Sequence, residues 1–213
     1  MLVVFLGPPG SGKGTQSKIV STALNYKHAS TGDMLRETAK GTTLLGKELG
    51  KLMSEGALVS DSMVNEIVAQ TLKSDEYKNG CILDGYPRTL EQALFLETIN
   101  IDNYIVVHLK IESDKLGQRI ESRYICLDCG AIYNTDISPK KEGICDCGSE
   151  NFEHRADDNA VALLKRIDLY EDQISMILDF YRQRKKLVAV DADKSVEEVT
   201  KQILESIKNI DFV

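Results

Sequence analysis

The chain has 213 residues, of which 42% are hydrophobic and 28% charged, proportions that suit a soluble globular protein and exclude a chiefly disordered one. This length is near the upper limit for a single domain, so we expect one core with small insertions. The formal net charge of −7, from 26 basic and 33 acidic side chains, argues against general affinity for nucleic acid or an anionic membrane. A polyanion must therefore bind at a local basic site.

The first element is an apolar run of strand length at residues 2–6, followed by Gly7-Pro8-Pro9-Gly10-Ser11-Gly12-Lys13-Gly14-Thr15 and a helix-compatible stretch at 16–24. A strand, a glycine-rich turn and a helix N-terminus leave several backbone N–H groups aimed at one point, beside the Lys13 ammonium. The spacing G-x-x-x-x-G-K predicts a phosphate-binding loop (P-loop) for a polyphosphate; the alternative is a simple turn. Gly14 replaces the usual hydroxyl, which arrives one place later as Thr15, and this argues against direct magnesium ligation by that hydroxyl.

Short apolar runs then alternate with helical patterns. Together with residues 2–6, the runs at 81–83, 104–109 and 187–190 predict strands that are buried on both faces, and residues 27–30 predict a shorter fifth strand. Apolar residues between 64 and 72 recur at helical spacing. Two capping boxes, Thr89-Leu90-Glu91-Gln92 and Ser195-Val196-Glu197-Glu198, are expected to open helices. This order predicts an α/β fold with a parallel sheet of about five strands flanked by helices.

An aspartate directly follows the predicted strand 81–83, within Asp84-Gly85-Tyr86-Pro87-Arg88. Ligands gather at the carboxyl ends of parallel strands, so Asp84 is expected near the P-loop, where it can hold magnesium through water. The alternative for Asp84 is a helix or turn cap. Gly85 and Pro87 predict a tight bend that directs Arg88 inward; the alternative is a surface arginine.

Residues 122–156, called the lid segment below, lose the helical period and contain four of the five cysteines, as Cys126-x-x-Cys129 and Cys145-x-Cys147. We interpret this segment as a small insertion. The clustering suits a tetrahedral zinc site of four thiolates. The alternatives are two disulfides, which the lack of a secretion signal disfavours, or unpaired structural cysteines.

The second cysteine pair has a single residue between its members, so both sulfurs reach one ion only if the backbone bends sharply. Gly148, directly after the pair, permits such a bend, and Asp146 offers an oxygen that could replace one sulfur. The fifth cysteine, Cys81, lies within an apolar run and is expected to be a small buried hydrophobe.

Four motifs together resemble the adenylate kinase family. They are residues 7–16, Ser30-Thr31-Gly32-Asp33-Met34-Leu35-Arg36, residues 84–89 with Gln92, and Arg155-Ala156-Asp157-Asp158-Asn159. The resemblance covers the whole chain in order, and with an inserted segment of 35 residues it points to the long-lid, zinc-containing bacterial type. It implies reversible, magnesium-dependent phosphoryl transfer from ATP to AMP giving two ADP, with structural zinc, in a protein that is usually monomeric. The N-terminal residues lack the pattern of a signal peptide, so a cytoplasmic location is expected. No membrane or nucleic-acid partner is expected.

The resemblance also implies an organisation and a set of site residues. The core would comprise residues 1–29, 60–121 and 157–213, with an AMP-binding flap at 30–59 and the zinc-ribbon-like lid at 122–156. Positions matching the ATP site are Gly10, Ser11, Gly12, Lys13, Gly14, Thr15, Arg119, Arg123, Ile132, Tyr133 and Lys194. Those matching the AMP site are Thr31, Arg36, Ala57, Leu58, Val59, Gly85, Tyr86, Pro87, Arg88, Gln92, Arg155 and Arg166. Catalytic roles fall to Lys13, Arg88, Arg123, Arg155 and Arg166, while Asp157 and Asp158 match acidic lid residues.

The transfer needs no covalent nucleophile, because its loose transition state spreads charge over oxygens that arginine forks bind well. Two alternatives remain open. One is a kinase of UMP, CMP or GMP on the same scaffold. The other is a non-enzymatic nucleotide-gated switch or nucleic-acid-binding zinc ribbon. Against the second, the chain has no Asn-Lys-x-Asp motif, and residues 122–155 contain four Lys or Arg against six Asp or Glu.

Overall fold

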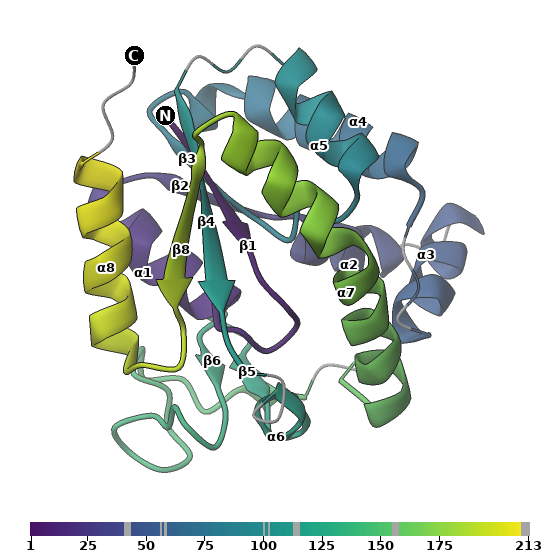
Figure 1. Cartoon of the computed structure of the whole chain (residues 1–213). Coiled ribbons are helices and arrows are strands. Elements are labelled where there is room, and N and C mark those ends of the chain that lie inside the picture. The colour runs from purple at the N-terminus through teal and green to yellow at the C-terminus, as the bar shows by residue number, and fades with distance from the viewer. Residues whose placement is uncertain are drawn as a thin grey trace.

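A parallel sheet of five strands forms the centre of the molecule (Figure 1). The computed structural model describes residues 1–40, 44–55, 57, 59–99, 101, 103–112, 116–154 and 158–209. The strands are β1 (Leu2–Leu6), β2 (Lys27–Ser30), β3 (Cys81–Asp84), β4 (Tyr104–Lys110) and β8 (Leu187–Asp191), in the spatial order β2-β3-β1-β4-β8. Every neighbouring pair is parallel. All five predicted strands are confirmed, with bounds that differ by at most one residue.

Helices cover both faces of this sheet. The helices of the described residues are α1 (Lys13–Leu24), α2 (Thr31–Ala39), α3 (Leu44–Ser54), α4 (Asp61–Lys73), α5 (Leu90–Thr98), α6 (Leu116–Glu121), α7 (Ala160–Gln183) and α8 (Val196–Lys208), with a short 3-10 turn η1 (Asp75–Tyr77). Helices α1 and α8 pack on one face, and α4, α5 and α7 on the other (Figure 1). The predicted flap contains α2 and α3.

The alternation of β1 explains the two layers. Val3 and Phe5 point into the cluster that includes Ile203 of α8, whereas Leu2 and Val4 join the cluster on the opposite face. Because every residue of β1 is buried, its sequence is apolar throughout rather than alternating.

Strand β8 departs from the expectation of burial on both faces. Val190 is buried, but Ala189 and Asp191 are exposed. The reason is position, because β8 lies at the edge of the sheet and pairs only with β4. Helix α1 also begins earlier than expected, at Lys13, since Gly12 takes a left-handed φ of 90° and the Gln16 N–H already bonds the Gly12 carbonyl.

One of the two predicted capping boxes forms completely. Ser195 accepts from the Glu198 N–H, and the Glu198 carboxylate accepts from the Ser195 N–H. At α5 the Thr89 hydroxyl caps the Gln92 N–H as expected, but the Gln92 side chain does not return to Thr89. It bonds Arg88 and Asp61 instead, a difference that shapes the site described below.

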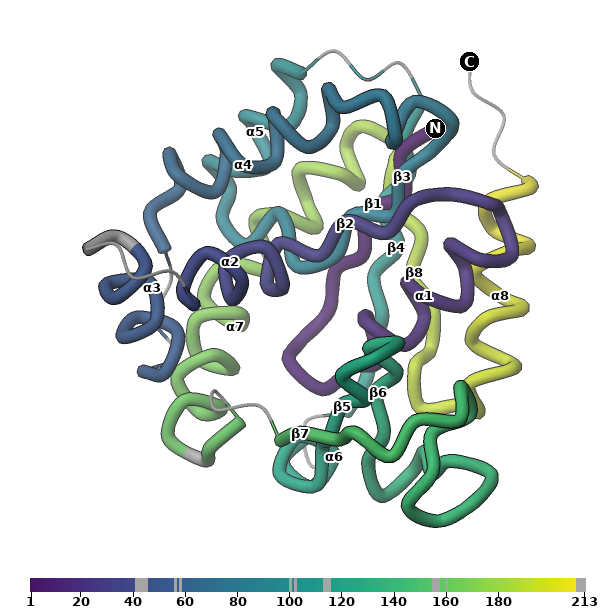
Figure 2. Tube along the Cα trace, turned by 180° about the vertical axis from the view of Figure 1, so that it is seen from behind, coloured from purple at the N-terminus to yellow at the C-terminus, as the bar shows by residue number. Residues whose placement is uncertain are grey.

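The lid segment forms a separate antiparallel sheet of β5 (Tyr124–Cys126), β6 (Ile132–Tyr133) and β7 (Phe152–Glu153), in the order β6-β5-β7. Tyr124, Tyr133 and Phe152 pack in its small core. The segment lies beyond the carboxyl ends of the main strands, where the arrowheads of β4 and β8 point in Figure 1. The view from behind in Figure 2 shows it at the same end of the molecule. None of the described helices is long and apolar enough to span a membrane.

Candidate active site

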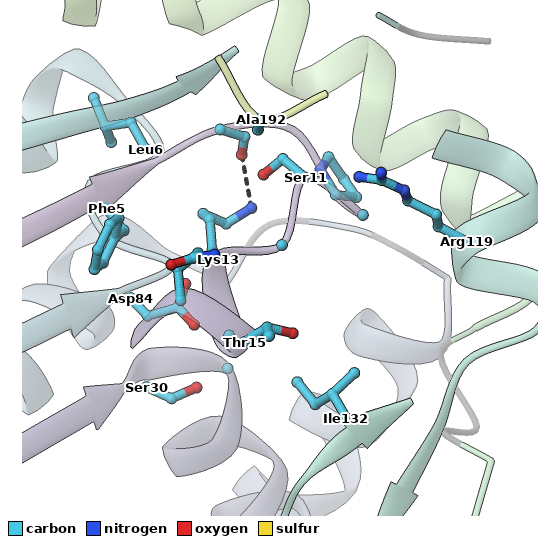
Figure 3. Close-up of a pocket in the computed structure, with 18 of the residues that line it drawn as sticks. Phe5, Leu6, Ser11, Lys13, Thr15, Ser30, Asp84, Arg119, Ile132 and Ala192 are labelled. Atoms are coloured by element: carbon cyan, nitrogen blue, oxygen red, sulfur yellow. Dashed lines mark hydrogen bonds between the residues drawn. The ribbon is translucent and has the colours of Figure 1, made fainter. Parts of the chain in front are cut away.

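A large cavity of about 440 Å³ opens at the carboxyl ends of the main strands, between the P-loop, α7 and the lid segment. It unites residues that are far apart in the sequence. The predicted residues that line it are Gly10, Ser11, Gly12, Lys13, Gly14, Thr15, Arg36, Asp84, Gly85, Pro87, Arg88, Arg119, Arg123, Ile132, Arg166 and Lys194. Figure 3 shows Lys13, Asp84 and Thr15 around one space, with Ile132 and Arg119 facing them from other elements.

A small pocket of about 50 Å³ adjoins this cavity. The predicted residues that line it are Thr31, Arg36, Ala57, Val59, Gly85, Arg88, Gln92 and Arg166. Arg36, Arg88 and Arg166 line both spaces, so three guanidinium-bearing side chains stand at their boundary. Arg88 is largely exposed but directed to this boundary, with its Nε donating to the Gly85 carbonyl at 2.8 Å.

Two predicted residues do not line either space. Tyr86 is fully buried, and its hydroxyl donates to the Asn65 Oδ1 at 2.6 Å. Tyr133 is buried in the core of the lid segment, on the side of its strand that faces away from the cavity, and its hydroxyl oxygen lies 3.3 Å from the Cys145 Sγ. Leu58 and Arg155, with Asp157, lie outside the described residues.

The P-loop presents an uncapped helix end. The left-handed Gly12 begins α1 without a side-chain cap, and the first turn carries no acidic residue. The Lys13 ammonium folds back and donates to the carbonyls of Gly7 and Pro8, both at 2.8 Å. The Ser11 hydroxyl is buried and has no hydrogen-bond partner among the described residues. Free N–H groups, a hydroxyl and an ammonium together suit a polyphosphate.

The charge of Lys13 depends on its neighbours. The pKa of Lys13 is lowered to about 7, chiefly by burial. The nearby Asp84 opposes this shift, and Arg88, Arg166 and Arg123 add to it. A bound polyanion would reverse this shift by favouring the ammonium. The protonation state of Lys13 therefore depends on whether an anionic ligand is bound in the cavity.

Asp84 lies next to the P-loop, as the strand order requires. It is 9% exposed, and its Oδ2 lies 3.7 Å from the His28 Nε2. Burial opposes ionisation, but the neighbouring His28 and the Lys13 ammonium outweigh it and hold the pKa of the Asp84 carboxyl below its usual range. A buried carboxylate that stays ionised beside a phosphate-binding loop is a suitable ligand for a hydrated magnesium ion.

The lid segment touches the P-loop helix. A Cβ at Gly14 would lie 2.8 Å from the Ile132 Cδ1, so a larger residue at position 14 would require the end of the Ile132 side chain to move. Nearby, the Lys18 ammonium donates to the Cys129 carbonyl at 2.6 Å. These contacts place the small sheet beside the large cavity, which Gly130 and Ile132 also line.

Three acidic residues hold arginines that line the cavity, and one of them, Asp33, pairs with Arg36 within α2. Asp158, whose side chain is 3% exposed, accepts two hydrogen bonds from Arg123 and lies 3.8 Å from Arg166. Arg119 donates through Nε to Asp136 of the lid segment at 2.7 Å. The guanidinium groups are thus held in place before any ligand binds.

The four lid cysteines come together. All four sulfurs lie within 4.8 Å of one another, with 3.7 Å between Cys126 and Cys147 and 3.5 Å between Cys129 and Cys145. A tetrahedral ion with Zn–S bonds of about 2.3 Å separates its sulfurs by about 3.8 Å. These separations exceed a disulfide bond of about 2.05 Å, and the cysteines are free thiols. The donor set therefore fits zinc.

Both cysteine turns bend in similar ways. The Gly130 N–H bonds the Cys126 carbonyl and the Gly148 N–H bonds the Cys145 carbonyl, each at 2.7 Å, with φ of 65° and 92° at the two glycines. The shortened pair thus reaches the cluster through the bend expected at Gly148. Asp146 is not part of the cluster, because its carboxylate accepts from the Lys140 N–H at 3.0 Å. Cys81 is buried as expected, which raises the pKa of its thiol to about 12.

Comparison with known proteins accords with this geometry. A family model described as "Adenylate kinase" matches residues 5–186. The adenylate kinase of Rickettsia africae is 38% identical over 98% of this chain and 99% of its own length. The chain belongs to the adenylate kinase family. The adenylate kinase of Rhizobium etli is likewise 38% identical, over 95% of this chain and 97% of its own. As an adenylate kinase family member, the chain is a nucleoside monophosphate kinase, a phosphotransferase that binds nucleotides.

Several residues around the site escaped the sequence-based prediction. Lys18, Asp61 and Asp136 act through contacts with distant segments, and no local motif marks them. Tyr170 lines the large cavity, and its hydroxyl lies 3.0 Å from the Nε2 of His108. Helical spacing places Tyr170 four residues after Arg166, one turn along the same face of α7, and this is the one signal that could have found it.

Proposed function

We propose that this protein catalyses the reversible transfer of the terminal phosphoryl group of magnesium-bound ATP to AMP, giving two ADP. The observation that carries the proposal is the pair of adjoining pockets with Arg36, Arg88 and Arg166 at their boundary. The P-loop side takes the polyphosphate donor, and the small pocket takes the acceptor monophosphate. The phosphoryl group then passes between them through a cationic boundary.

The residues of this boundary act by position and charge. A loose transition state spreads negative charge over the equatorial oxygens of the transferred group. Arg88 and Arg166 present planar forks that bind two oxygens each and stay protonated throughout, while Lys13 and the first-turn N–H groups of α1 hold the donor phosphates. No covalent nucleophile is required.

The two metals have separate places in this proposal. Asp84 would hold magnesium through its water shell, and the ion would neutralise charge on the donor phosphates when bound. Cys126, Cys129, Cys145 and Cys147 would hold one structural zinc. The lid segment, positioned by this cluster against Gly14 and Lys18, would exclude water that could otherwise accept the phosphoryl group.

A coupled assay tests the proposal. ADP formation is followed with magnesium-ATP and, separately, AMP, UMP, CMP and GMP as acceptors. We expect AMP to have the highest kcat/KM, and turnover without an acceptor to be negligible. Preference for UMP, CMP or GMP would identify another monophosphate kinase, and loss of ATP without an acceptor would indicate an ATPase.

A further inference from the structure

A buried amide in the small pocket is clamped by two neighbours. Gln92, which lines this pocket and is 2% exposed, accepts from the Arg88 backbone N–H through Oε1 at 2.7 Å. Its Nε2 donates to the Asp61 Oδ1, also at 2.7 Å. The second oxygen of Asp61 accepts from the Thr89 hydroxyl at 2.8 Å. Asp61, in the first turn of α4, therefore connects this helix to the start of α5 and holds the Gln92 side chain in the small pocket.

This clamp gives the amide a single polarity. A backbone N–H can only donate, and a carboxylate can only accept. If the Gln92 amide turned over, its oxygen would face the Asp61 carboxylate and its NH₂ would face the Arg88 N–H, so both hydrogen bonds would become repulsive contacts. The orientation follows from the chemistry of the two partners.

The two hydrogen bonds leave part of the Gln92 amide available to a ligand in the small pocket. An amide has two N–H donors and two acceptor lone pairs, and the two contacts use one of each. The remaining N–H and lone pair have no other partner among the residues that the structure describes. Gln92 therefore presents one donor and one acceptor whose order is fixed.

Purine bases differ in the order of these groups. A 6-aminopurine offers a donor at C6 beside a ring-nitrogen acceptor at N1, whereas a 6-oxopurine offers an acceptor at C6 beside an N–H donor at N1. An amide that could turn over would serve either edge. An amide of fixed orientation can hydrogen-bond the edge of only one of these two bases. With the other base, donors would face donors and acceptors would face acceptors in a buried site.

We propose that Asp61 is a specificity-positioning residue, which locks the Gln92 amide so that the small pocket accepts a 6-aminopurine monophosphate and rejects a 6-oxopurine monophosphate. The proposal rests on the proposed function, since it assumes that the small pocket holds the acceptor nucleotide. Asp61 does not line either pocket, and its contact with a residue that lines the small pocket is the hydrogen bond from Gln92.

The test compares AMP with IMP as acceptors of ATP, because IMP differs from AMP in the 6-substituent and the N1 proton, without the extra amino group of GMP. In Asp61→Asn the new amide can donate as well as accept, so Gln92 gains the reversed orientation. We expect the ratio of kcat/KM for AMP to that for IMP to fall roughly tenfold, because the Arg88 N–H still favours the original orientation. Asp61→Ser also removes the carboxylate that forbids the reversed amide, and it should lower the ratio in the same direction.

Asn65→Ala is the matched control. Asn65 also lies in α4 and accepts from the Tyr86 hydroxyl at 2.6 Å, and that hydroxyl also donates to the backbone carbonyl of Gln92 at 2.9 Å. Asn65 does not contact the Gln92 side-chain amide, so the variant disturbs the same junction without releasing the amide. Loosening this junction should leave the AMP:IMP ratio unchanged. An unchanged ratio in both folded Asp61 variants, or an equal fall in Asn65→Ala, would overturn the role of Asp61. Failure of the unmodified protein to use AMP would instead refute the proposed function.

Discussion

Asp158 accepts two hydrogen bonds from Arg123, at Oδ2 at 2.6 Å and at Oδ1, and the same carboxylate lies 3.8 Å from Arg166. Two guanidinium groups of the large cavity thus share one buried carboxylate, which leaves a net positive charge beside the P-loop. The arrangement holds the arginines in place while keeping the attraction for a polyphosphate.

Replacing Asp158 should therefore reveal the repulsion between these arginines. We expect Asp158→Asn to lower the free energy of unfolding by about 3 kcal/mol, as when one partner of a buried ion pair is removed. Urea denaturation without nucleotide measures this loss. Asp179→Asn removes a surface ion pair to Arg182 on α7 and should change stability by less than about 1 kcal/mol. Equal effects of the two changes would contradict the structural role of Asp158.

Arg88 and Lys13 should act on charge that develops during transfer. Arg88→Ala and Lys13→Met are each expected to lower kcat by roughly 100-fold, about 3 kcal/mol, as for one preorganised electrostatic donor. Steady-state kinetics with ATP and AMP measures the loss. Arg182→Ala, an exposed arginine outside the cavity, should keep normal turnover. Near-normal kcat in a correctly folded Arg88→Ala would refute the proposed role of Arg88.

Lys13 should take up a proton when ATP binds at pH 8. Burial lowers the pKa of the free Lys13 to about 7, so the amine is mostly neutral at pH 8, whereas bound phosphates raise this pKa and favour the ammonium. Because the complex then binds more protons than the free protein, affinity for ATP should fall as pH rises above 7. Calorimetry in buffers of different ionisation enthalpy detects the uptake, and Lys13→Met should abolish it. Uptake that persists in Lys13→Met would assign the proton to another group.

The lid segment should hold one zinc ion through its four cysteines. Metal analysis of protein purified without chelator should give about one equivalent per chain, because the sulfur spacing matches a tetrahedral ion. Cys147→Ser should weaken metal retention and loosen the lid segment while the main core stays folded. Asp146→Ala should keep the metal, since its carboxylate bonds Lys140 instead. Fully reduced protein with an ordered lid segment but without metal would rule the site out.

Lys18 should act as a latch between α1 and the lid segment. Its ammonium donates to the Cys129 carbonyl at 2.6 Å, so Lys18→Gln should increase hydrogen exchange in residues 124–133. A ligand that joins both nucleotides should restore protection there and also protect residues 44–54, by closing both segments. Lys201→Gln, an exposed lysine of α8, serves as the control and should change neither region. Unaltered exchange in Lys18→Gln would show that the contact does not hold the lid segment.

The linear order of residues determined the strands, the P-loop and the grouping of cysteines. An apolar run of strand length such as residues 2–6 can bury every side chain only as an inner strand covered on both faces. The glycines of residues 7–12 allow the backbone turn that a phosphate-binding loop needs. The four cysteines and Gly148 likewise carry their chemistry in local spacing. Such features depend on neighbours in the chain, and a sequence displays them directly.

Only the tertiary structure determined which hydrogen-bond and ion-pair partners the polar side chains have. Gln92 had the position to close a capping box with Thr89, yet a carboxylate from α4 and the Arg88 N–H took its amide instead. The exposure of β8 followed from its place at the sheet edge, and the pairing of Arg123 with Asp158 joins residues 35 apart in the chain. Hydrogen bonds and ion pairs form with whichever group the fold brings within about 3 Å, and that distance is set by the packing of entire elements.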